Sequence, residues 1–305
     1  MLRISYEVIK SVDPNAYVVT SGLGFPSFLD AILRNTDNPN NGRVTPQYPR
    51  GGGAYFDGIG YHAYPHFDDA LRIYNNQTQA FDYFRNSDAA GADMGRVKEL
   101  FDKVLRDYGY NGQVFPKKQY LITETSLPRK EFGEFIGSTE AQRNWAAKAM
   151  VSCLKNDIHQ LHIFKIAEET TFETATYSFD VMGLYERLNY NNKLKPKLTQ
   201  LGLAYRSASQ ILFGKGYDSM RTRALNLPST IDGIALRDSN GVLTYVLWAK
   251  TTGDKNENVT ATYSFPTNFN YTQLIKRDWT FSENQNQTTL SAQNIILSEI
   301  GRAHV

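Results

Sequence analysis

Three short apolar segments of the chain each run into polar side chains that could do acid–base chemistry. They are residues 55–65, which carry His62 and Tyr64, residues 119–126, which carry Glu124, and residues 158–167, which are followed by Glu168 and Glu169. Glu124 is the most informative of these residues because a glutamate is rarely buried without a partner. A carboxylate at the end of a buried strand could act as a nucleophile, an acid or a base. It could equally form a structural ion pair with the loop residue Arg129.

The elements that must position these side chains alternate between strands and helices. Strands are expected at 16–20, 55–62, 119–124 and 158–167, and amphipathic helices at 2–12, 26–34, 93–108, 138–157 and 198–212. This alternation is typical of a parallel α/β sheet. The carboxyl ends of parallel strands meet at one edge, where acidic side chains are typical of a catalytic site. We therefore expect His62, Tyr64 and Glu124 to lie on one rim with residues 165–169.

The sequence pattern changes near residue 214, from helical periodicity to short strands separated by turn residues. Strands are expected at 225–227, 233–236, 244–249, 261–265 and 294–297. Such a run of short strands is typical of an antiparallel β-sandwich. The sequence therefore predicts an α/β domain over 1–213, a β-sandwich module over 214–300 and an unstructured tail over 301–305.

The two central segments together carry a more specific pattern. A strand that ends in Ile-Thr-Glu at 122–124, preceded by a strand of the form Asp-Gly-Ile-x-x-His-x-Tyr at 57–64, resembles the sixth and seventh strands of the clan A retaining glycoside hydrolases. Because a β-rich module follows, the family 39-like members are the most similar. The resemblance covers most of the chain and implies a (β/α)8 TIM barrel and a carbohydrate substrate. It also implies that Glu124 is the catalytic nucleophile and that His62 and Tyr64 hold its carboxylate by hydrogen bonds.

The barrel implied by this resemblance is incomplete. A (β/α)8 barrel takes about 250 residues, whereas only four strands are expected before residue 214. If Glu124 ends the seventh strand, these are strands five to eight, and residues 1–213 form the C-terminal half of a TIM barrel. The general acid/base of the clan is the glutamate of an Asn-Glu pair that closes strand four, so it would precede Met1. The Asn-Glu pair of this chain, at 256–257, lies in the β-rich part.

The expected protein is thus a fragment of a retaining glycoside hydrolase that cleaves β-glycosidic bonds in polysaccharides or oligosaccharides. Its nucleophile is present and its acid/base is missing. This chain alone should therefore be inactive, because the leaving oxygen needs a proton from a second carboxyl group. The open strand edges of a half barrel should also favour self-association. We expect a secreted or periplasmic parent enzyme whose signal peptide was lost with the missing N-terminus, and the localisation of this chain stays open.

Further substrate contacts are expected around the rim. His66, Phe164, Lys165 and Glu168 follow or end the strands near Glu124 and could contact sugar rings or hydroxyl groups. The clan commonly carries a sugar-stacking tryptophan on strand eight, where this chain offers Phe164 and Lys165. Lys165 could suit an acidic sugar, or it could form a structural ion pair with Glu168.

The composition argues against several other classes of protein. The chain has 305 residues and a net charge of +2, with no basic run interleaved with aromatic residues, so no nucleic-acid partner is expected. A single cysteine, Cys153, excludes internal disulfides and Cys-based zinc sites. No apolar run reaches the roughly 18 residues of a membrane span. No metal or cofactor is expected. The His-Glu-x-x-His helix, the phosphate loop and the Gly-x-Ser-x-Gly elbow, which would support an unrelated α/β enzyme, are absent from the sequence.

Two other functions stay open at the level of sequence. The first is a non-catalytic carbohydrate-binding protein built on a decayed barrel. The second is an unrelated α/β enzyme in which Glu168 or Glu169 acts with Glu124. An Asn-Glu strand end in sequence upstream of Met1 would favour the glycoside hydrolase over the binding protein.

Overall fold

The computed structural model describes residues 1–35, 38–48, 51, 55–67, 71–188, 195–269, 271, 274–277, 287–290 and 295–298. The predicted tail at 301–305 lies outside these residues. The chain divides into two compact units. Unit 1 comprises Met1–Ala63, Gly95–Thr125 and Asn156–His162, and unit 2 comprises Tyr64–Met94, Ser126–Lys155 and Ile163–Val305. The predicted domain boundary near residue 214 stays a prediction.

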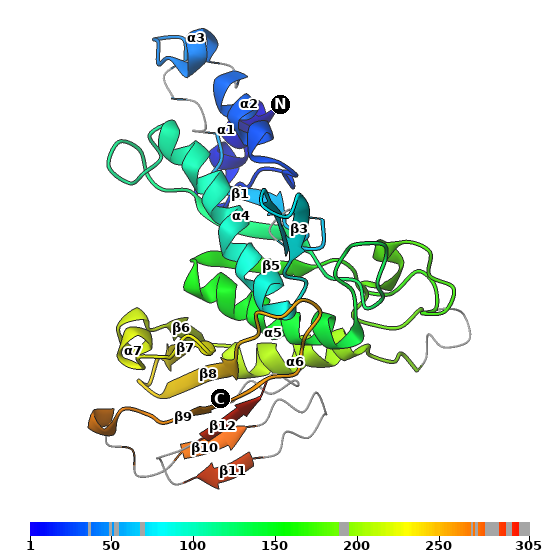
Figure 1. Ribbon diagram of the computed structural model, residues 1–305. Coiled ribbons are helices and arrows are strands. Elements are labelled where there is room, and N and C mark those ends of the chain that lie inside the picture. The colour runs from blue at the N-terminus through cyan, green and yellow to red at the C-terminus, as the bar shows by residue number, and fades with distance from the viewer. Residues whose placement is uncertain are drawn as a thin grey trace. The chain divides into compact units, whose positions relative to one another are not determined.

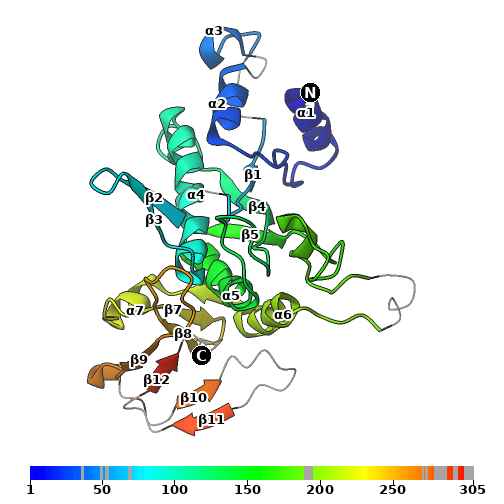
Figure 2. The same ribbon diagram turned by 45° about the vertical axis from the view of Figure 1, so that its right-hand side comes forward.

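Unit 1 is built on a parallel sheet. Its strands are β1 (Gly58–His62), β4 (Gln119–Thr125) and β5 (Ile158–Ile163, whose last residue belongs to unit 2), in the order β1-β4-β5. Figure 2 shows the three strands side by side, and β1 pairs with β4 in parallel. Single parallel bridges from Val19 to Gly58 and from Leu23 to Tyr61 add the extended segment that the sequence predicts first. The predicted parallel sheet is confirmed, and its place in a half barrel stays a prediction.

The centre of this sheet is buried, as its apolar sequence predicts. Gly58 to Tyr61 of β1 and Tyr120 to Ile122 of β4 are all buried, which is typical of parallel strands covered on both faces. The ring of Tyr61 packs against Phe101 of helix α4 (Ser87–Asp107), with the two ring centroids 4.8 Å apart. Figure 1 shows this long helix beside β1.

Three further helices belong to unit 1, namely α1 (Leu2–Val12), α2 (Pro26–Asn35) and α3 (Pro39–Gly42). α2 buries Leu29 and Leu33 completely. Phe28, which the helical pattern places inward, is 52% exposed and packs edge-on against Phe25 instead. The apolar stripe of α1 is also exposed, and none of its residues is buried.

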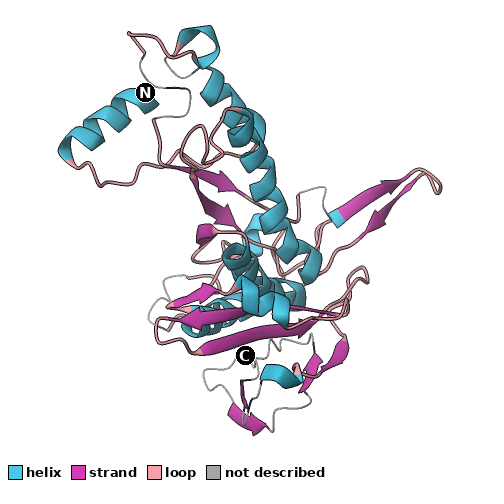
Figure 3. Cartoon of the chain, turned by 90° about the vertical axis from the view of Figure 1, so that its left-hand side faces the viewer, coloured by secondary structure: helices cyan, strands magenta, loops and turns pink. Residues whose placement is uncertain are grey.

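Unit 2 contains a hairpin that the sequence does not predict. β2 (Arg72–Asn75) and β3 (Ala80–Tyr83) pair in antiparallel fashion, and Figure 3 shows them as a two-stranded ribbon closed by a turn. α4 follows and begins at Ser87 rather than at the predicted Asp93. The side chain of Asn86 accepts a hydrogen bond from the N–H of Ala89 at 2.9 Å, which caps the first turn.

The rest of unit 2 consists of helices and antiparallel strands. The helices are α5 (Thr139–Lys155), α6 (Gln200–Leu212), α7 (Ser219–Ala224) and the 3-10 turns η2 (Ser178–Val181) and η3 (Thr267–Phe269). The strands are β6 (Lys215–Tyr217), β7 (Ile231–Asp238), β8 (Leu243–Ala249), β9 (Thr260–Tyr263), β10 (Leu274–Arg277), β11 (Gln287–Leu290) and β12 (Ile295–Ser298). Leu225, in a predicted strand, instead caps the end of α7.

The sheet β6-β7-β8 separates two apolar clusters of unit 2. Ile234 and Val246 face a cluster that includes Ala147 of α5 and Ala208 of α6. The alternate residues of the same strands face a second cluster, which includes Tyr263 of β9 and Leu297 of β12, because side chains alternate between the two faces of a strand. β9 pairs with β12, and β10 pairs with β11, both in antiparallel fashion. The predicted antiparallel strands are thus present, and their assembly as a β-sandwich stays a prediction.

Candidate functional site

Glu124 and His62 lie next to each other in unit 1. Nδ1 of His62 is 3.4 Å from Oε2 of Glu124. β1 and β4 are in regular register as far as the pair Tyr61 and Ile122, after which His62 pairs with Glu124 because β4 carries an extra residue, Thr123. Such a bulge shifts the alternation of side chains along one strand. It therefore brings the carboxylate to the same side of the sheet as the imidazole.

The backbone around Glu124 is fixed, while its carboxylate stays accessible. The N–H of Ala63 donates to the carbonyl of Glu124 at 3.0 Å, and the hydroxyl of Thr123 donates to the carbonyl of Tyr61 at 3.2 Å. Thr125 is completely buried. The side chains of Glu124 and His62 are 37% and 30% exposed. A positioned carboxylate that a substrate can still reach is what nucleophilic catalysis requires.

A glycine makes room for the imidazole. A Cβ at Gly22 would lie 1.9 Å from Nε2 of His62, far inside van der Waals contact. The segment that carries Gly22 is held on β1, since the N–H of His62 donates to the carbonyl of Leu23 at 3.0 Å. The sequence does not predict this contact, and its one local signal is the glycine that follows the first predicted strand.

Three of the predicted substrate contacts meet in an aromatic cluster of unit 2. The ring of Tyr64 lies edge-on to those of His66 and Phe164, with centroid distances of 5.9 and 6.2 Å. Phe179 contacts all three rings, with centroid distances of 5.1 Å to Tyr64, 5.8 Å to His66 and 5.5 Å to Phe164. The sequence gives no periodic pattern around Phe179, so it was not predicted.

His66 serves as a buried aromatic ring in this cluster. It is only 3% exposed, and neither ring nitrogen has a hydrogen-bond partner in the described part of the chain. Burial lowers the pKa of this imidazole to about 3, because the charged form would lose its hydration. The ring is therefore neutral at ordinary pH. Its predicted contact with substrate stays a prediction.

Lys165 and Glu168, also in unit 2, are engaged in ion pairs. Glu168 is 3% exposed and accepts hydrogen bonds from Nε and Nη2 of Arg129 at 2.5 and 2.6 Å. This bidentate contact raises the pKa of Arg129. Lys165 pairs with Glu169. The alternatives drawn from the sequence had paired Arg129 with Glu124 and Lys165 with Glu168, whereas the structure pairs these two cations with other carboxylates.

The Asn-Glu pair at 256–257 has a structural place in unit 2. Glu257 is 6% exposed and accepts hydrogen bonds from the N–H and the hydroxyl of Ser87 at 2.7 and 2.6 Å. Asn144 donates to the same carboxylate at 2.8 Å. Glu257 thus satisfies the first turn of α4, where a negative charge is favourable.

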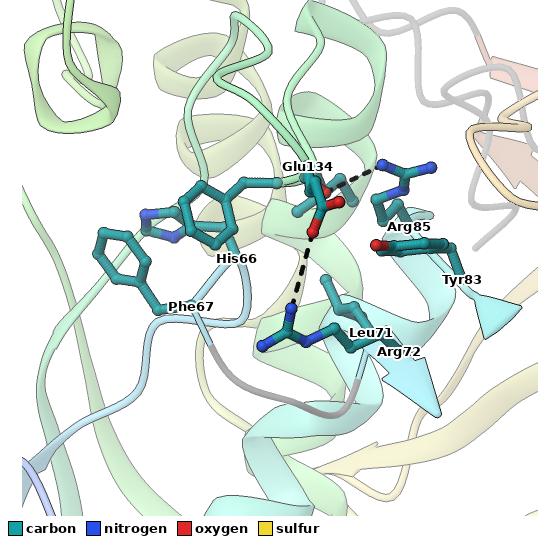
Figure 4. A pocket seen from close by; sticks show the side chains of 9 residues that line it. His66, Phe67, Leu71, Arg72, Tyr83, Arg85 and Glu134 are labelled. Atoms are coloured by element: carbon teal, nitrogen blue, oxygen red, sulfur yellow. Dashed lines mark hydrogen bonds and ion pairs between the residues drawn. The ribbon is translucent and has the colours of Figure 1, made fainter. Parts of the chain in front are cut away.

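A small pocket of unit 2 lies between the β2–β3 hairpin and residues 134–136, as Figure 4 shows. Its volume is about 30 Å³, which leaves room for little more than a water molecule. Nη1 of Arg72 lies 3.8 Å from the carboxylate of Glu134, and Nη1 of Arg85 donates to the carbonyl of Glu134 at 3.0 Å. We assign these contacts the structural role of holding the hairpin against that loop.

Metal and membrane contacts have no support among the described residues. Within these residues, no three or more His, Cys, Asp and Glu side chains are arranged to hold a metal ion. No helix in the described part of the chain has the length and apolar character that crossing a membrane requires.

Comparison with known proteins gives matches only at the level of structure. No family model matches the sequence, and no curated protein sequence matches it. A family 51 α-L-arabinofuranosidase from Bifidobacterium longum is similar in structure, with a TM-score of 0.57 and 10% identity over 97% of this chain and 60% of that chain. A family 51 α-L-arabinofuranosidase from Thermotoga petrophila gives a TM-score of 0.54 and 11% identity over 97% and 58% of the two chains. A family 51 arabinofuranosidase from Xanthomonas axonopodis pv. citri gives 0.51 and 8% over 99% and 61%.

The shared feature is the fold, since the identities are about 10%. These enzymes are glycoside hydrolases, which agrees with the predicted likeness to clan A. The narrower likeness to family 39 stays a prediction. The chain spans about 60% of the length of the enzymes that it matches.

Proposed function

We propose that this chain supplies the nucleophile of a retaining glycoside hydrolase, and that Glu124 is that nucleophile. One observation carries the proposal. The carboxylate of Glu124 stands at the carboxyl end of a buried parallel strand, 3.4 Å from the imidazole of His62, in a chain whose fold is similar to that of family 51 arabinofuranosidases. In α/β barrels this end of the strands carries the catalytic groups.

The reaction step follows from the chemistry of the pair. An oxygen of the ionised Glu124 attacks the anomeric carbon of the sugar, and the bond to the leaving oxygen breaks with its electron pair. The product is a glycosyl ester on Glu124, which water later hydrolyses. His62 orients the attacking carboxylate by a hydrogen bond. The side chain of Glu124 is then already positioned when the substrate binds, and less of the substrate's binding energy is needed to orient it.

The general acid/base is left unassigned within these 305 residues. Three glutamates are candidates because they follow β5 or belong to the Asn-Glu pair, but each is engaged in another contact. Arg129 binds Glu168, Lys165 binds Glu169, and the first turn of α4 binds Glu257. A carboxylate whose oxygens are held by a cationic side chain or by a helix terminus is not free to approach a leaving group. We therefore propose that turnover by this chain depends on leaving groups that need no proton.

The proposed substrates are glycosides of polysaccharides or oligosaccharides. The sequence favours β-glycosides, while two of the similar structures are of α-L-arabinofuranosidases. A substrate panel should therefore include both an α-L-arabinofuranoside and β-D-xylo- and β-D-glucopyranosides.

The experiment uses 2,4-dinitrophenyl glycosides of these three sugars, because dinitrophenolate leaves without protonation. The expected result is a burst of about one dinitrophenolate per chain with one of the sugars, followed by slow turnover as the ester accumulates. Glu124→Gln should abolish the burst while the melting temperature changes little, since an amide of the same shape cannot form the ester. A burst that persists in Glu124→Gln would exclude the nucleophile.

A carbohydrate-binding protein without catalysis is the second candidate function. The rings of Phe67 and Tyr177, which contact Phe179 and are 42% and 56% exposed, favour it, because exposed rings can bind sugars without any reacting group. Saturable binding of a polysaccharide with no burst from any of the three glycosides would favour this reading over the hydrolase.

A further inference from the structure

Three aromatic rings of unit 2 form a continuous, partly exposed surface. The ring of Phe179 lies between those of Phe67 and Tyr177, with centroid distances of 5.6 and 5.3 Å. The interplanar angles to Phe179 are 38° and 33°, so each outer ring is tilted against the central ring and is not edge-on to it. Phe67 is 42% exposed and Tyr177 is 56% exposed. We name these three residues the aromatic platform.

The aromatic platform rests on a second layer of rings. The imidazole of His66 lies against Phe67 with a centroid distance of 3.9 Å and an interplanar angle of 36°. Tyr64 meets Phe179 edge-on at 5.1 Å. Because His66 is buried and its pKa is about 3, this supporting layer stays neutral at ordinary pH. The rings of His66 and Tyr64 therefore hold Phe67 and Phe179 of the aromatic platform in a fixed orientation.

The backbone that carries Tyr177 and Phe179 is also fixed. The carboxylate of Asp180 accepts hydrogen bonds from the N–H groups of Thr176 and Tyr177, both at 2.9 Å. The side-chain amide of Gln142, on α5, donates to the carbonyl of Val181 at 3.1 Å. A side chain with few torsions on a fixed turn loses little entropy when it binds a ligand.

We propose that the aromatic platform binds a sugar ring of an oligosaccharide by stacking. This inference rests on the proposed function, from which the carbohydrate ligand is taken, and names a surface of unit 2 that binds it. The C–H groups on one face of a sugar ring carry partial positive charge and pack on the negative face of an aromatic ring. The exposed rings of Phe67 and Tyr177, which both contact Phe179, offer this contact to a sugar ring.

The surroundings of the aromatic platform favour a sugar over an apolar partner. The exposed residues Thr171 and Thr174, whose hydroxyls are hydrogen-bonded to each other, lie in the same loop as Tyr177, and sugar hydroxyls pair with such groups. Along the chain, Phe67 follows the carboxyl end of β1 and Tyr177 follows β5, and ligand sites of α/β folds are built from such loops. The sequence predicts a stacking residue on the last strand, whereas Phe67 follows β1 and the other two rings follow β5.

The test measures binding with the full chain carrying Glu124→Gln, so that no substrate is consumed. Affinity gel electrophoresis in soluble arabinoxylan, linear arabinan or β-glucan reports the dissociation constant for each polysaccharide. The expected result is retardation by one of them, weakened about tenfold or more by Tyr177→Ala, which corresponds to about 1.4 kcal/mol. Tyr177→Trp, which keeps a flat ring, should retain binding. Phe213→Ala is the matched control, because Phe213 is 87% exposed outside the platform.

Each outcome decides the proposal. If none of the three polysaccharides retards the chain, or if Tyr177→Ala and Phe179→Ala both bind as tightly as the Phe213→Ala control, the aromatic platform is not a sugar site. Melting curves of the variants exclude loss of fold as the cause of weaker binding. If a glycosyl ester forms on Glu124 but polysaccharide binding is unchanged in Tyr177→Ala, the proposed function is supported and only the role of the aromatic platform is contradicted. If Tyr177→Ala weakens binding but no ester forms on Glu124, the aromatic platform is supported and the proposed nucleophile is contradicted.

Discussion

At the scale of single residues, the contact between Gly22 and His62 gives a test in which neither Glu124 nor His62 is itself substituted. In Gly22→Ala the new methyl group would overlap Nε2 of the imidazole, so the ring must leave its present position beside Glu124. The rate of the dinitrophenolate burst should fall about a hundredfold, the loss expected when a group at the reacting centre is misplaced by about 1 Å. Gly24→Ala is the matched control, because a Cβ there meets nothing within 4 Å. Equal rates for the two variants would mean that the position of His62 does not matter.

The buried imidazole of His66 makes the stability of the protein pH-dependent. Its pKa is about 3 in the folded chain and about 6.5 when unfolded. Above pH 6.5 neither state binds the proton, so the stability is at its full value. As the pH falls towards 3 the unfolded state takes up a proton that the folded state does not, and the free energy of unfolding decreases by up to about 1.4 kcal/mol per pH unit.

His66→Phe keeps a ring in the cluster and removes this titration. Urea unfolding at pH 7 and pH 4.5 should show a smaller loss of stability at low pH in His66→Phe than in the unmodified chain. His162→Phe, which replaces an exposed histidine, should behave like the unmodified chain. An unchanged pH dependence in His66→Phe would show that this ring is not buried in the neutral form.

At the scale of elements, the pair of Arg129 and Glu168 joins the loop after β4 to the segment after β5 within unit 2. Glu168→Gln leaves a largely buried guanidinium without its counter-charge and should lower the free energy of unfolding by about 3 kcal/mol. Glu169→Gln removes an exposed carboxylate from its pair with Lys165 and should change it by less than about 0.5 kcal/mol. Urea denaturation measures both. Similar values for the two variants would contradict the assignment of Glu168 as a buried structural anion.

The same elements show what local sequence could and could not predict. The strand around Glu124 is an apolar run with its own propensity, so both its place and its parallel partner β1 follow from local pattern. The start of α4 was missed because its first turn, with Asp88 and Gly91, carries no apolar stripe and is defined by the cap at Asn86. Ion-pair partners depend on tertiary packing. The sequence therefore predicted that Arg129 and Lys165 form ion pairs but not that their partners are Glu168 and Glu169. The rings of Tyr177 and Phe179 lie in a loop without periodicity, so nothing local marks them.

At the scale of the whole molecule, we predict self-association. The apolar stripe of α1 is exposed, with relative exposures of 55% at Ile4 and 59% at Val8, and such a patch favours association in water. Light scattering at micromolar concentration should report a mass above 34.6 kDa. Ile4→Gln with Val8→Gln should shift the mass towards the monomer.

The control for this prediction replaces two exposed valines outside α1. Val114 and Val242 are 67% and 58% exposed, so Val114→Gln with Val242→Gln removes a similar apolar surface elsewhere. This variant should associate like the unmodified chain. A monomeric unmodified chain, or equal effects of the two double variants, would contradict a role for α1.

The most direct measurement for the central claim is the mass of the Glu124 peptide after reaction with a mechanism-based label. A 2,4-dinitrophenyl 2-deoxy-2-fluoroglycoside forms the glycosyl ester without needing a proton donor, and the fluorine slows hydrolysis of that ester. We predict that peptide mapping of the labelled chain finds one fluoroglycosyl group, on Glu124, and that Glu124→Gln takes up none. Labelling of a different carboxylate, or no labelling by the arabinofuranosyl, xylosyl and glucosyl reagents, would contradict the assignment of Glu124 as the nucleophile.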